Sequence, residues 1–236
     1  MNIALKTYSG LVTSRPDTTW ERENRDLYIP DFVTGMLWSP VLFTRIGKAG
    51  KFVGRKYADR YIDGMGFGLL LHPLVECAGQ SVPSSCMDHT TILPFPLYNK
   101  VVLDTPGNEA VYLLNGNDVM CSFRTGAETP EETWSGTVPA EINAGTTLAE
   151  TALAETALAE TALAGTALAG TALAGTIQAE LILDAICEVS RFTSLRIGDI
   201  VATELLSPAP LPLGASRTTL SATFCDNGIF DFSVLR

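Results

Sequence analysis

The sequence predicts a mainly β fold of the α+β class, on the strength of two hairpin signals and one amphipathic helix. The first hairpin covers residues 111–123 and turns at Asn115-Gly116, a dipeptide that accepts the positive φ angles of a two-residue turn. The second covers residues 219–234 and turns at residues 226–228, which read Asp-Asn-Gly. Apolar and β-branched residues flank both turns, as expected of paired strands.

The predicted helix spans residues 178–192. Its apolar residues follow an i, i+1, i+4, i+5, i+8 spacing, which places them on one face of an α-helix. They are Leu181, Ile182, Ala185, Ile186 and Val189. We expect this face to be buried against the sheet.

Shorter signals complete the predicted element order. Residues 56–63 have helical spacing and end at Gly64, a residue that commonly stops a helix. Apolar or β-branched runs predict strands at residues 26–30, 41–46, 67–71 and 200–202. Strands therefore outnumber helices, and the prediction is a β-rich α+β domain.

Composition narrows the classes of function. The chain has 236 residues, of which 46% are hydrophobic, so it is long and apolar enough to bury a sizeable core. Only 18% are charged, below the roughly 25% of a typical soluble domain. The formal net charge of −10 repels phosphate backbones, and we find no cluster of lysine and arginine dense enough to reverse it locally. We expect no nucleic-acid partner.

Cysteine usage and hydropathy indicate the compartment. The cysteines are odd in number and never spaced as Cys-x-x-Cys; they are Cys77, Cys86, Cys121, Cys187 and Cys225. We expect reduced thiols packed as small apolar groups in a cytoplasmic protein. No stretch approaches the ~20 apolar residues of a membrane span, and the first residues lack the apolar run of a signal peptide, so we expect no membrane partner.

The chain divides into three regions of different texture. Residues 1–125 and 178–236 are ordinary globular sequence, whereas residues 126–177 are of low complexity and repeat the pentad Thr-Ala-Leu-Ala-Glu or Thr-Ala-Leu-Ala-Gly. A five-residue step advances about 140° around a helix, so the leucines would build no apolar face. The unit also resembles pentapeptide-repeat solenoids, with Ala where Asp or Asn is usual. We expect a mobile or loosely helical insertion, with a marginal coil or a protein-interaction module as alternatives.

The two globular regions resemble the fumarylacetoacetate hydrolase family, particularly its short bacterial members. The resemblance is carried by Thr13-Ser14-Arg15-Pro16-Asp17, Tyr28-Ile29-Pro30-Asp31-Phe32, Arg45-Ile46-Gly47-Lys48, residues 56–68, Met87-Asp88, residues 189–203 and Phe230-Asp231-Phe232, in the family's order. It implies a mixed β-sheet roll of the family's C-terminal-domain type that pairs into homodimers. Residues 1–125 and 178–236 would then be parts of one domain, with residues 126–177 inserted between them.

The family's metal site is the next implication of this resemblance. Family members hold Mg²⁺ or Mn²⁺, which polarises a dicarbonyl substrate for C–C hydrolysis, decarboxylation or isomerisation. Two ligands come from a Glu-x-Glu strand, whose matching positions here are Ser39 and Val41, and a third, an Asp, matches Leu70. A hydroxyl and two aliphatic groups cannot replace the anionic oxygens that such a hard cation prefers. We therefore predict no metal site, no cofactor and no catalytic residue.

Other features of the family's active site are also missing from the sequence. Ser85 stands where a lysine is expected, and no His/Glu lid dyad precedes His72, the first histidine. The loop after Thr203, which is glycine-rich in the family, reads Glu204-Leu205-Leu206-Ser207-Pro208. Pro40 removes a strand N–H beside Ser39, so we expect a local change in the backbone there.

The remaining polar residues offer weaker candidates. His72 precedes Pro73, and we expect a surface or hydrogen-bonded side chain rather than a base. His89 follows Asp88, and such a pair can orient an imidazole. Asp59 and Asp63 are four residues apart on the predicted helix, where Arg55, Lys56 and Arg60 favour a solvated, salt-bridged face. Glu150, Glu155 and Glu160 do not align on a helix and are interpreted as solubilising.

These observations favour a non-catalytic homologue of the family that has lost its metal ligands, acting as a binding or structural subunit. The alternative is a divalent-metal-dependent hydrolase, decarboxylase or isomerase that acts on a small dicarbonyl acid such as an acylpyruvate. Its Mg²⁺ or Mn²⁺ would be held by Asp63, Glu76 or Asp88.

Overall fold

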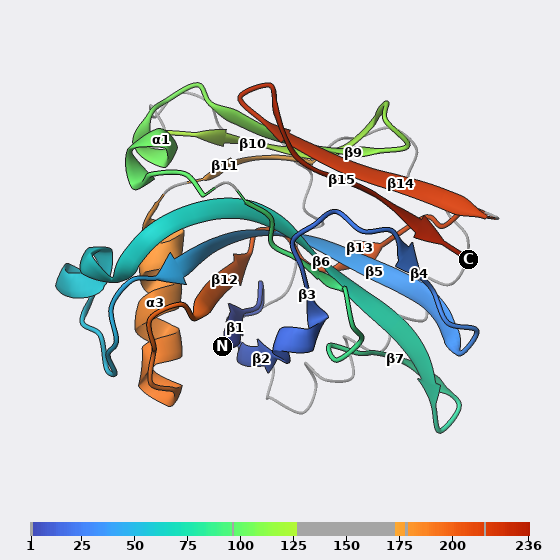
Figure 1. The fold of residues 1–236 in the computed structure, drawn as a ribbon, viewed down its shortest axis with the longest axis horizontal. Helices are drawn as coiled ribbons and strands as arrows, with labels where there is room; N and C mark the ends of the chain where they lie inside the picture. Colours follow the sequence, from blue (N-terminus) through green and yellow to red (C-terminus); the bar gives the residue numbers. More distant parts are fainter. Residues whose placement is uncertain (1, 96, 127–172, 178, 215) are drawn as a thin grey trace, which may run out of the picture.

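The computed structural model describes residues 2–95, 97–126, 173–177, 179–214 and 216–236, and these form two β-sheets with one longer α-helix (Figure 1). The nine-stranded sheet, called here the large sheet, is mixed, because β1 pairs with β12 and β3 with β8 in parallel while its other pairs are antiparallel. In spatial order its strands are β2 (Val12–Arg15), β1 (Ile3–Lys6), β12 (Ile200–Glu204), β5 (Val33–Ile46), β6 (Ile62–Cys77), β8 (Thr91–Ile92) and β3 (Trp20–Glu21), with β13 (Ala209–Pro210) beside β5 and β7 (Gln80–Pro83) beside β6.

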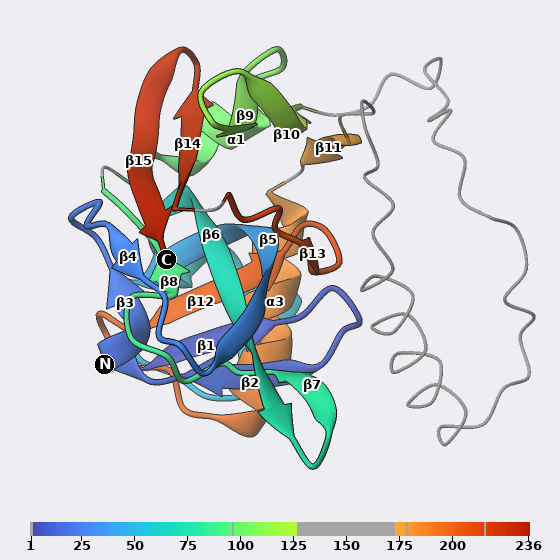
Figure 2. The same ribbon diagram turned by 90° about the vertical axis from the view of Figure 1, so that its right-hand side faces the viewer.

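The six-stranded sheet, called here the small sheet, lies over the large one (Figure 2). Its order is β11 (Leu173–Ile177), β10 (Asp118–Thr125), β9 (Glu109–Leu114), β14 (Arg217–Phe224), β15 (Asn227–Leu235) and β4 (Leu27–Tyr28). The helical segments are α1 (Lys100–Asp104), α3 (Glu180–Phe192) and the 3₁₀ turns η1 (Asp17–Thr19) and η2 (Arg55–Tyr61). Each sheet contains strands from both residues 2–126 and residues 179–236, so these two segments contribute to the same core.

The main core lies between the two sheets. Phe67 of the large sheet packs on Phe224 of the small sheet with ring centroids 4.8 Å apart. The buried Tyr112 hydroxyl donates to the Gly68 carbonyl at 3.1 Å, which satisfies its polar end. Helix α3 packs on β12 and β1, and its residues Ile182 and Ile186 join the same cluster.

The large sheet curls around its other face until its two ends meet. Arg15 at the end of β2 donates to the Leu71 carbonyl on β6 and to Thr91 Oγ1 on β8, at 3.0 and 3.1 Å. Thr19 Oγ1 also lies 2.8 Å from Thr91 Oγ1. Hydrocarbon side chains fill the interior of this roll: Ile3, Leu5, Val41, Phe43, Leu70, Leu93, Ile200 and Ala202.

Alternate glycines on β6 let these side chains approach the backbone. Gly66 and Gly68 face the interior of the roll, because they pair with Phe43 and Val41 of β5, whose side chains lie in that interior. A Cβ on Gly66 would lie 2.7 Å from the Phe43 ring, and one on Gly68 would lie 2.4 Å from the Ile92 carbonyl oxygen. Neither position has room for a side chain, so the interior is packed up to the strand itself.

Pro40 sits inside β5 without breaking the sheet. The pairing of β12 with β5 ends at Val41, and the pairing with β13 begins at Trp38. Pro40 therefore lies in the gap between two neighbours, where no ladder bond requires its missing N–H. Its carbonyl still accepts a hydrogen bond from the Leu205 N–H at 2.9 Å. The expected local change is confined to the neighbouring strand, which divides into β12 and β13.

The predicted fold class is confirmed, and so are its main local signals. Strands β9 and β10 pair around Asn115 and Gly116, whose φ angles are 50° and 80°. Strands β14 and β15 also pair, but the positive φ angles fall at Cys225 and Asp226, so the predicted turn at residues 226–228 is placed too late. Strand β15 therefore already begins at Asn227.

The helix predictions need two corrections. Helix α3 begins at Glu180 and buries Leu183, whereas Leu181, assigned to the buried face, is 41% exposed. The segment predicted as a helix over residues 56–63 is instead the 3₁₀ turn η2, and β6 begins at Ile62 before Gly64 is reached. Pairing with β5 takes Ile62 and the residues after it into the sheet, so tertiary contacts override the helical pattern at the end of the predicted helix.

Strands β5 and β6 are far longer than predicted, at 14 and 16 residues. Both faces of these strands are covered, so they lack the alternation that marks a half-buried strand. Most of the low-complexity tract, residues 127–172, lies outside the described residues, and so do the expectations about its structure. Its last part forms β11, which pairs in parallel with β10, a strand that the pentad pattern did not predict.

The cysteine prediction holds only in part. All five thiols are free, but only Cys121 is fully buried, whereas Cys77, Cys86 and Cys225 are exposed. Cys77 and Cys225 border tight turns and Cys86 lies in the segment between β7 and β8, so these three lie outside the core. Among the described residues, no helix is long and apolar enough to cross a membrane.

Candidate functional site

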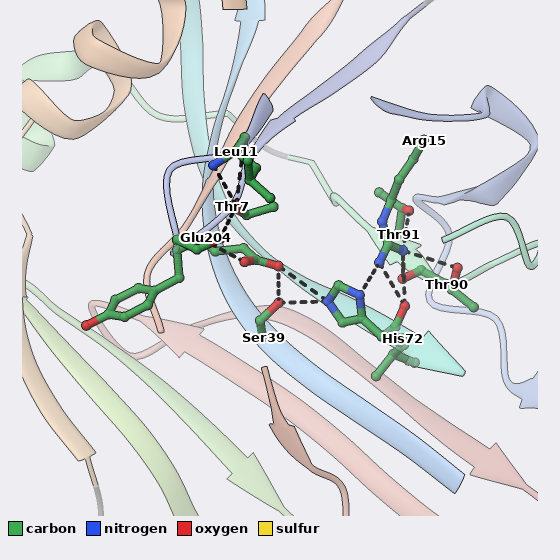
Figure 3. Close-up of polar contacts among 11 residues, drawn as sticks. Thr7, Leu11, Arg15, Ser39, His72, Thr90, Thr91 and Glu204 are labelled. Atoms are coloured by element: carbon green, nitrogen blue, oxygen red, sulfur yellow. Dashed lines mark hydrogen bonds and ion pairs between the residues drawn. The ribbon is translucent and has the colours of Figure 1, made fainter. Parts of the chain in front are cut away.

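A buried polar cluster lies inside the roll (Figure 3). It includes Ser39, one of the three positions that match metal ligands in the fumarylacetoacetate hydrolase family. We call it the interior cluster; it consists of Arg15, Ser39, His72 and Glu204. Ser39 on β5 pairs with Leu70 on β6, and His72 follows two residues later on the same face. Glu204, the last residue of β12, pairs with Val41, so it too faces the interior.

The four side chains form one continuous chain of hydrogen bonds (Figure 3). Arg15 Nη2 lies 3.0 Å from His72 Nδ1, and because a guanidinium only donates, Nδ1 accepts and the ring proton is on Nε2. His72 Nε2 lies 3.1 Å from Ser39 Oγ, and Ser39 Oγ donates to Glu204 Oε1 at 3.0 Å. The direct distance from His72 Nε2 to Glu204 Oε1 is 3.4 Å.

Backbone groups complete the two charged ends of the cluster. Glu204 Oε2 accepts from the Tyr8 N–H at 2.9 Å, and the tight loop that presents Tyr8 is closed by a Thr7 N–H to Leu11 carbonyl bond of 2.8 Å. At the other end, Arg15 donates to the carbonyl oxygens of Leu71 and Thr90 at 3.0 and 3.2 Å. Arg15 Nε is buried without a partner among the described residues.

The pKa values divide the charges between the two ends of the cluster. Burial lowers the pKa of Arg15 to about 10, partly opposed by Glu204, so the guanidinium stays charged at neutral pH. Burial also lowers the pKa of His72, which keeps its ring neutral. Burial alone would raise the pKa of Glu204, but hydrogen bonds from His72 and Tyr8 outweigh it and lower the pKa. The cluster is an internal ion pair bridged by a neutral imidazole.

This geometry does not suit nucleophilic catalysis. In a serine hydrolase triad, the carboxylate and the serine contact opposite ring nitrogens, so that the acid orients the base. Here Glu204 and Ser39 both lie at Nε2 of His72, and Nδ1 faces a cation. Ser39 is also completely buried, so no substrate can reach its hydroxyl.

The interior cluster does not fit a divalent cation either. Ser39, Val41 and Leu70 lie together on the inner face with at most 1% of their surface exposed, and Val41 and Leu70 belong to the hydrocarbon filling of the roll. Glu204 is the one carboxylate of the cluster, and its oxygens already accept from Ser39 and Tyr8. In the part of the chain that the structure describes, no group of three or more His, Cys, Asp or Glu side chains is arranged to hold a metal.

The other candidates from the sequence are dispersed. Asp59 and Asp63 do not come together, because Asp59 pairs with Lys100 at 2.8 Å and Asp63 with Arg45 at 2.6 Å. His89 contacts Glu21 rather than Asp88, at 2.7 Å. Burial would raise the pKa of Glu21, but bonds from the Glu23 backbone and His89 lower it. Glu76, Asp88 and Ser85 are exposed, and Glu150, Glu155 and Glu160 lie outside the described residues.

Sequence reasoning missed two members of the interior cluster. Arg15 was part of the family resemblance and Glu204 marked a departure from it, but neither was assigned to a site. Glu204 continues the alternation of Ile200 and Ala202 along β12, and this parity was the available signal that it faces the interior. His72 is hydrogen-bonded, as one of its two expected roles required.

Comparison with solved structures identifies the fold. A fumarylpyruvate hydrolase from Pseudomonas aeruginosa, solved with Mn²⁺ and pyruvate, superposes with a TM-score of 0.60 at 12% identity and covers 100% of this chain and 89% of its own. This chain has the fold of the fumarylacetoacetate hydrolases. A Yersinia pestis protein described as a member of that family gives 0.59 at 14% identity, covering 99% and 92%.

A further structural relative shows the range of activities found on this fold. The 5-carboxymethyl-2-hydroxymuconate delta-isomerase from Mycobacterium smegmatis gives a TM-score of 0.62 at 15% identity, over 100% of this chain and 78% of its own. No protein-family model matches the sequence, and no curated protein matches it. The similarity therefore rests on three-dimensional structure.

Proposed function

We propose that this chain is a non-catalytic homologue of the fumarylacetoacetate hydrolase family, acting as a binding or structural subunit. The observation that carries the proposal is the interior cluster, in which Arg15 supplies a positive charge to Glu204 from within the protein. An added divalent cation would meet a buried guanidinium and one carboxylate whose oxygens are already bonded. It would lose several kcal/mol of hydration without the anionic ligands that repay this cost.

Packing of the roll supports the same conclusion. Phe43 and the Ile92 backbone approach β6 so closely that even a Cβ at Gly66 or Gly68 would collide with them, so a dicarbonyl substrate has no room at these two positions of the inner face. The alternative, a Mg²⁺- or Mn²⁺-dependent hydrolase, decarboxylase or isomerase, needs ligands from Asp63, Glu76 or Asp88. These three are exposed and form no metal-binding group among the described residues.

Thermal unfolding in the presence of metal tests the proposal. A ligand at a hundredfold excess over its Kd stabilises a protein by about 2.7 kcal/mol, which raises the Tm of a domain of this size by roughly 5–11 °C. We expect no such rise with Mg²⁺ or Mn²⁺ at millimolar concentration. The fumarylpyruvate hydrolase from P. aeruginosa is the positive control. A metal-dependent rise here, or turnover of an acylpyruvate, would overturn the proposal.

The homodimer implied by the family resemblance is part of this proposal. Light scattering coupled to gel filtration measures it directly, and a monomeric mass at micromolar concentration would contradict it.

A further inference from the structure

The cations of this acidic chain are concentrated in one short segment. Residues 45–60 contain six of the sixteen lysines and arginines but a single acid, Asp59, although the chain as a whole carries a net charge of −10. This segment links β5 to β6 and includes η2. Its charge is opposite to that of the protein around it, so the expectation that no cluster of lysine and arginine reverses the negative charge locally is wrong for this segment.

Part of this positive charge lacks a counter-charge. Arg45 pairs with Asp63 and Arg55 with Asp184 at 2.8 Å. Asp59 is held by Lys100 from outside the segment. The remaining four cations, Lys48, Lys51, Lys56 and Arg60, have no carboxylate within 4.0 Å in the described ranges.

Three of these four cations surround one surface cleft with aromatic walls. The cleft has a volume of about 150 Å³ and is lined by Lys48, Lys51, Phe52, Tyr57, Arg60 and Tyr61, among others. Lys48 Nζ lies 5.8 Å from the Tyr61 ring centroid and Arg60 Cζ 5.3 Å from that of Tyr57. Lys51 Nζ lies 5.4 Å from the ring of Phe52. We call this feature the basic cleft.

The loop that builds the basic cleft is anchored to α3. The Phe52 N–H donates to the Ser190 carbonyl and the Val53 N–H to Ser190 Oγ, both at 2.9 Å. Gly50 exchanges two backbone bonds with Leu195 at 3.0 and 2.7 Å. These bonds flank Lys51 and fix the position of its backbone at the edge of the cleft.

Two positions in this loop show that its shape is specified. A Cβ on Gly50 would lie 2.5 Å from the Tyr61 ring, so only glycine allows that ring to close the cleft. Phe52 has a φ of 52°, a left-handed conformation that is costly for a bulky residue, and its side chain is 70% exposed. Strain of this kind is concentrated at ligand-binding sites, where the surrounding structure maintains it.

We propose that the basic cleft binds a small anion with two negative charges and a planar ring, an aryl phosphate being the simplest example. Three converging cations match at least two negative charges, and the exposed rings offer a face for stacking. A volume of about 150 Å³ accommodates one benzene-sized ring. The net charge of −10 opposes a long polyanion such as nucleic acid.

Calorimetric titration with phenyl phosphate tests this assignment, with inorganic phosphate and phenol as separate probes. We expect phenyl phosphate to bind more tightly than either fragment, and to bind more weakly as salt is raised. Replacing Lys51→Ala and Arg60→Ala together should weaken binding by about tenfold or more, because two charge-assisted contacts are lost. The matched control, Arg25→Ala with Arg124→Ala, removes the same charge elsewhere on the surface and should leave the affinity unchanged.

Three results would overturn the inference: no heat of binding with phenyl phosphate, equal weakening by the control pair, or equal affinity for inorganic phosphate. Circular dichroism of each variant verifies that the fold is retained. The titration contains no metal, so its outcome is independent of the proposal for the interior cluster.

Discussion

Replacing Glu204 with glutamine should destabilise the protein strongly, because it leaves the buried guanidinium of Arg15 without its counter-charge. Arg15 lies 3.0 Å from one nitrogen of His72, and Glu204 lies 3.4 Å from the other. Across the imidazole the two charges are at most roughly 9 Å apart, and at an effective dielectric constant of about 20 they attract by about 2 kcal/mol. With the cost of an unpaired buried charge included, removing one partner of a buried pair typically costs 3–5 kcal/mol.

A double-mutant cycle separates this attraction from other effects of the substitutions. The single variants are Glu204→Gln and Arg15→Met, and the double variant carries both. Arg15→Met also removes the Arg15 donors from the carbonyl oxygens of Leu71 and Thr90, of which Thr90 still accepts from the Leu71 N–H at 2.8 Å; this loss adds roughly 1–3 kcal/mol in both the single and the double variant. That term cancels in the cycle, so the coupling energy reports on the charge pair.

Urea denaturation at pH 7.5 measures each free energy of unfolding. We expect a coupling energy of about 2 kcal/mol, with the double variant less destabilised than the sum of the singles. Additive effects, with a coupling below about 0.5 kcal/mol, would refute the conclusion that Glu204 and Arg15 stabilise each other as an internal ion pair. Ser221→Ala, a partly exposed position on β14 in the small sheet, is a control that should leave the stability within about 0.5 kcal/mol.

Two further predictions concern pH and packing. The folded-state pKa of His72 lies below its ordinary 6.5, so the unfolded chain binds this proton first and stability should fall as the pH drops below about 6.5. The lowered pKa of Glu204 extends this loss below its ordinary 4.5; denaturation at several pH values measures both, and His72→Gln should flatten the upper part of the profile. Gly68→Ala should cost about 1–3 kcal/mol because its Cβ has no room, whereas Gly54→Ala, whose Cβ meets nothing closer than 3.8 Å, should be nearly neutral by the same assay.

Features set by neighbouring residues were predictable from the sequence. The Asn115-Gly116 turn and the apolar face of α3 depend on spacing and on backbone preferences that act within a few residues, and the structure contains both. The extent of β5 and β6 was not predictable in this way. Their pattern lacks alternation because the small sheet and the interior of the roll cover opposite faces.

The interior cluster depends on contacts that no local pattern encodes. Ser39 and Glu204 are 165 positions apart, and they meet because β12 inserts between β1 and β5. The family resemblance directed attention to Ser39 as a position that had lost a carboxylate. It gave no sign that Glu204 would supply one from another strand, with Arg15 to balance it.

The basic cleft likewise depends on tertiary contacts that the sequence pattern did not predict. Arg55, Lys56 and Arg60 were interpreted from the sequence only as part of a solvated, salt-bridged helix face. The convergence of the cations at the cleft depends on Ser190, which holds the loop from a distant helix. The grouping of these charges around one cleft therefore depends on tertiary contacts and is not encoded by their spacing along the chain.

The alternate glycines of β6 constrain how this protein can change. Any mutation that placed a carboxylate at Gly66 or Gly68 would first collide with Phe43 or with the Ile92 backbone. A new ligand there requires the opposing side chain to shrink or the adjoining strand to move in the same step. A single substitution that introduces a carboxylate at Gly66 or Gly68 would therefore lower stability before a metal could bind. The packed interior thus opposes the stepwise gain of a metal ligand on this face.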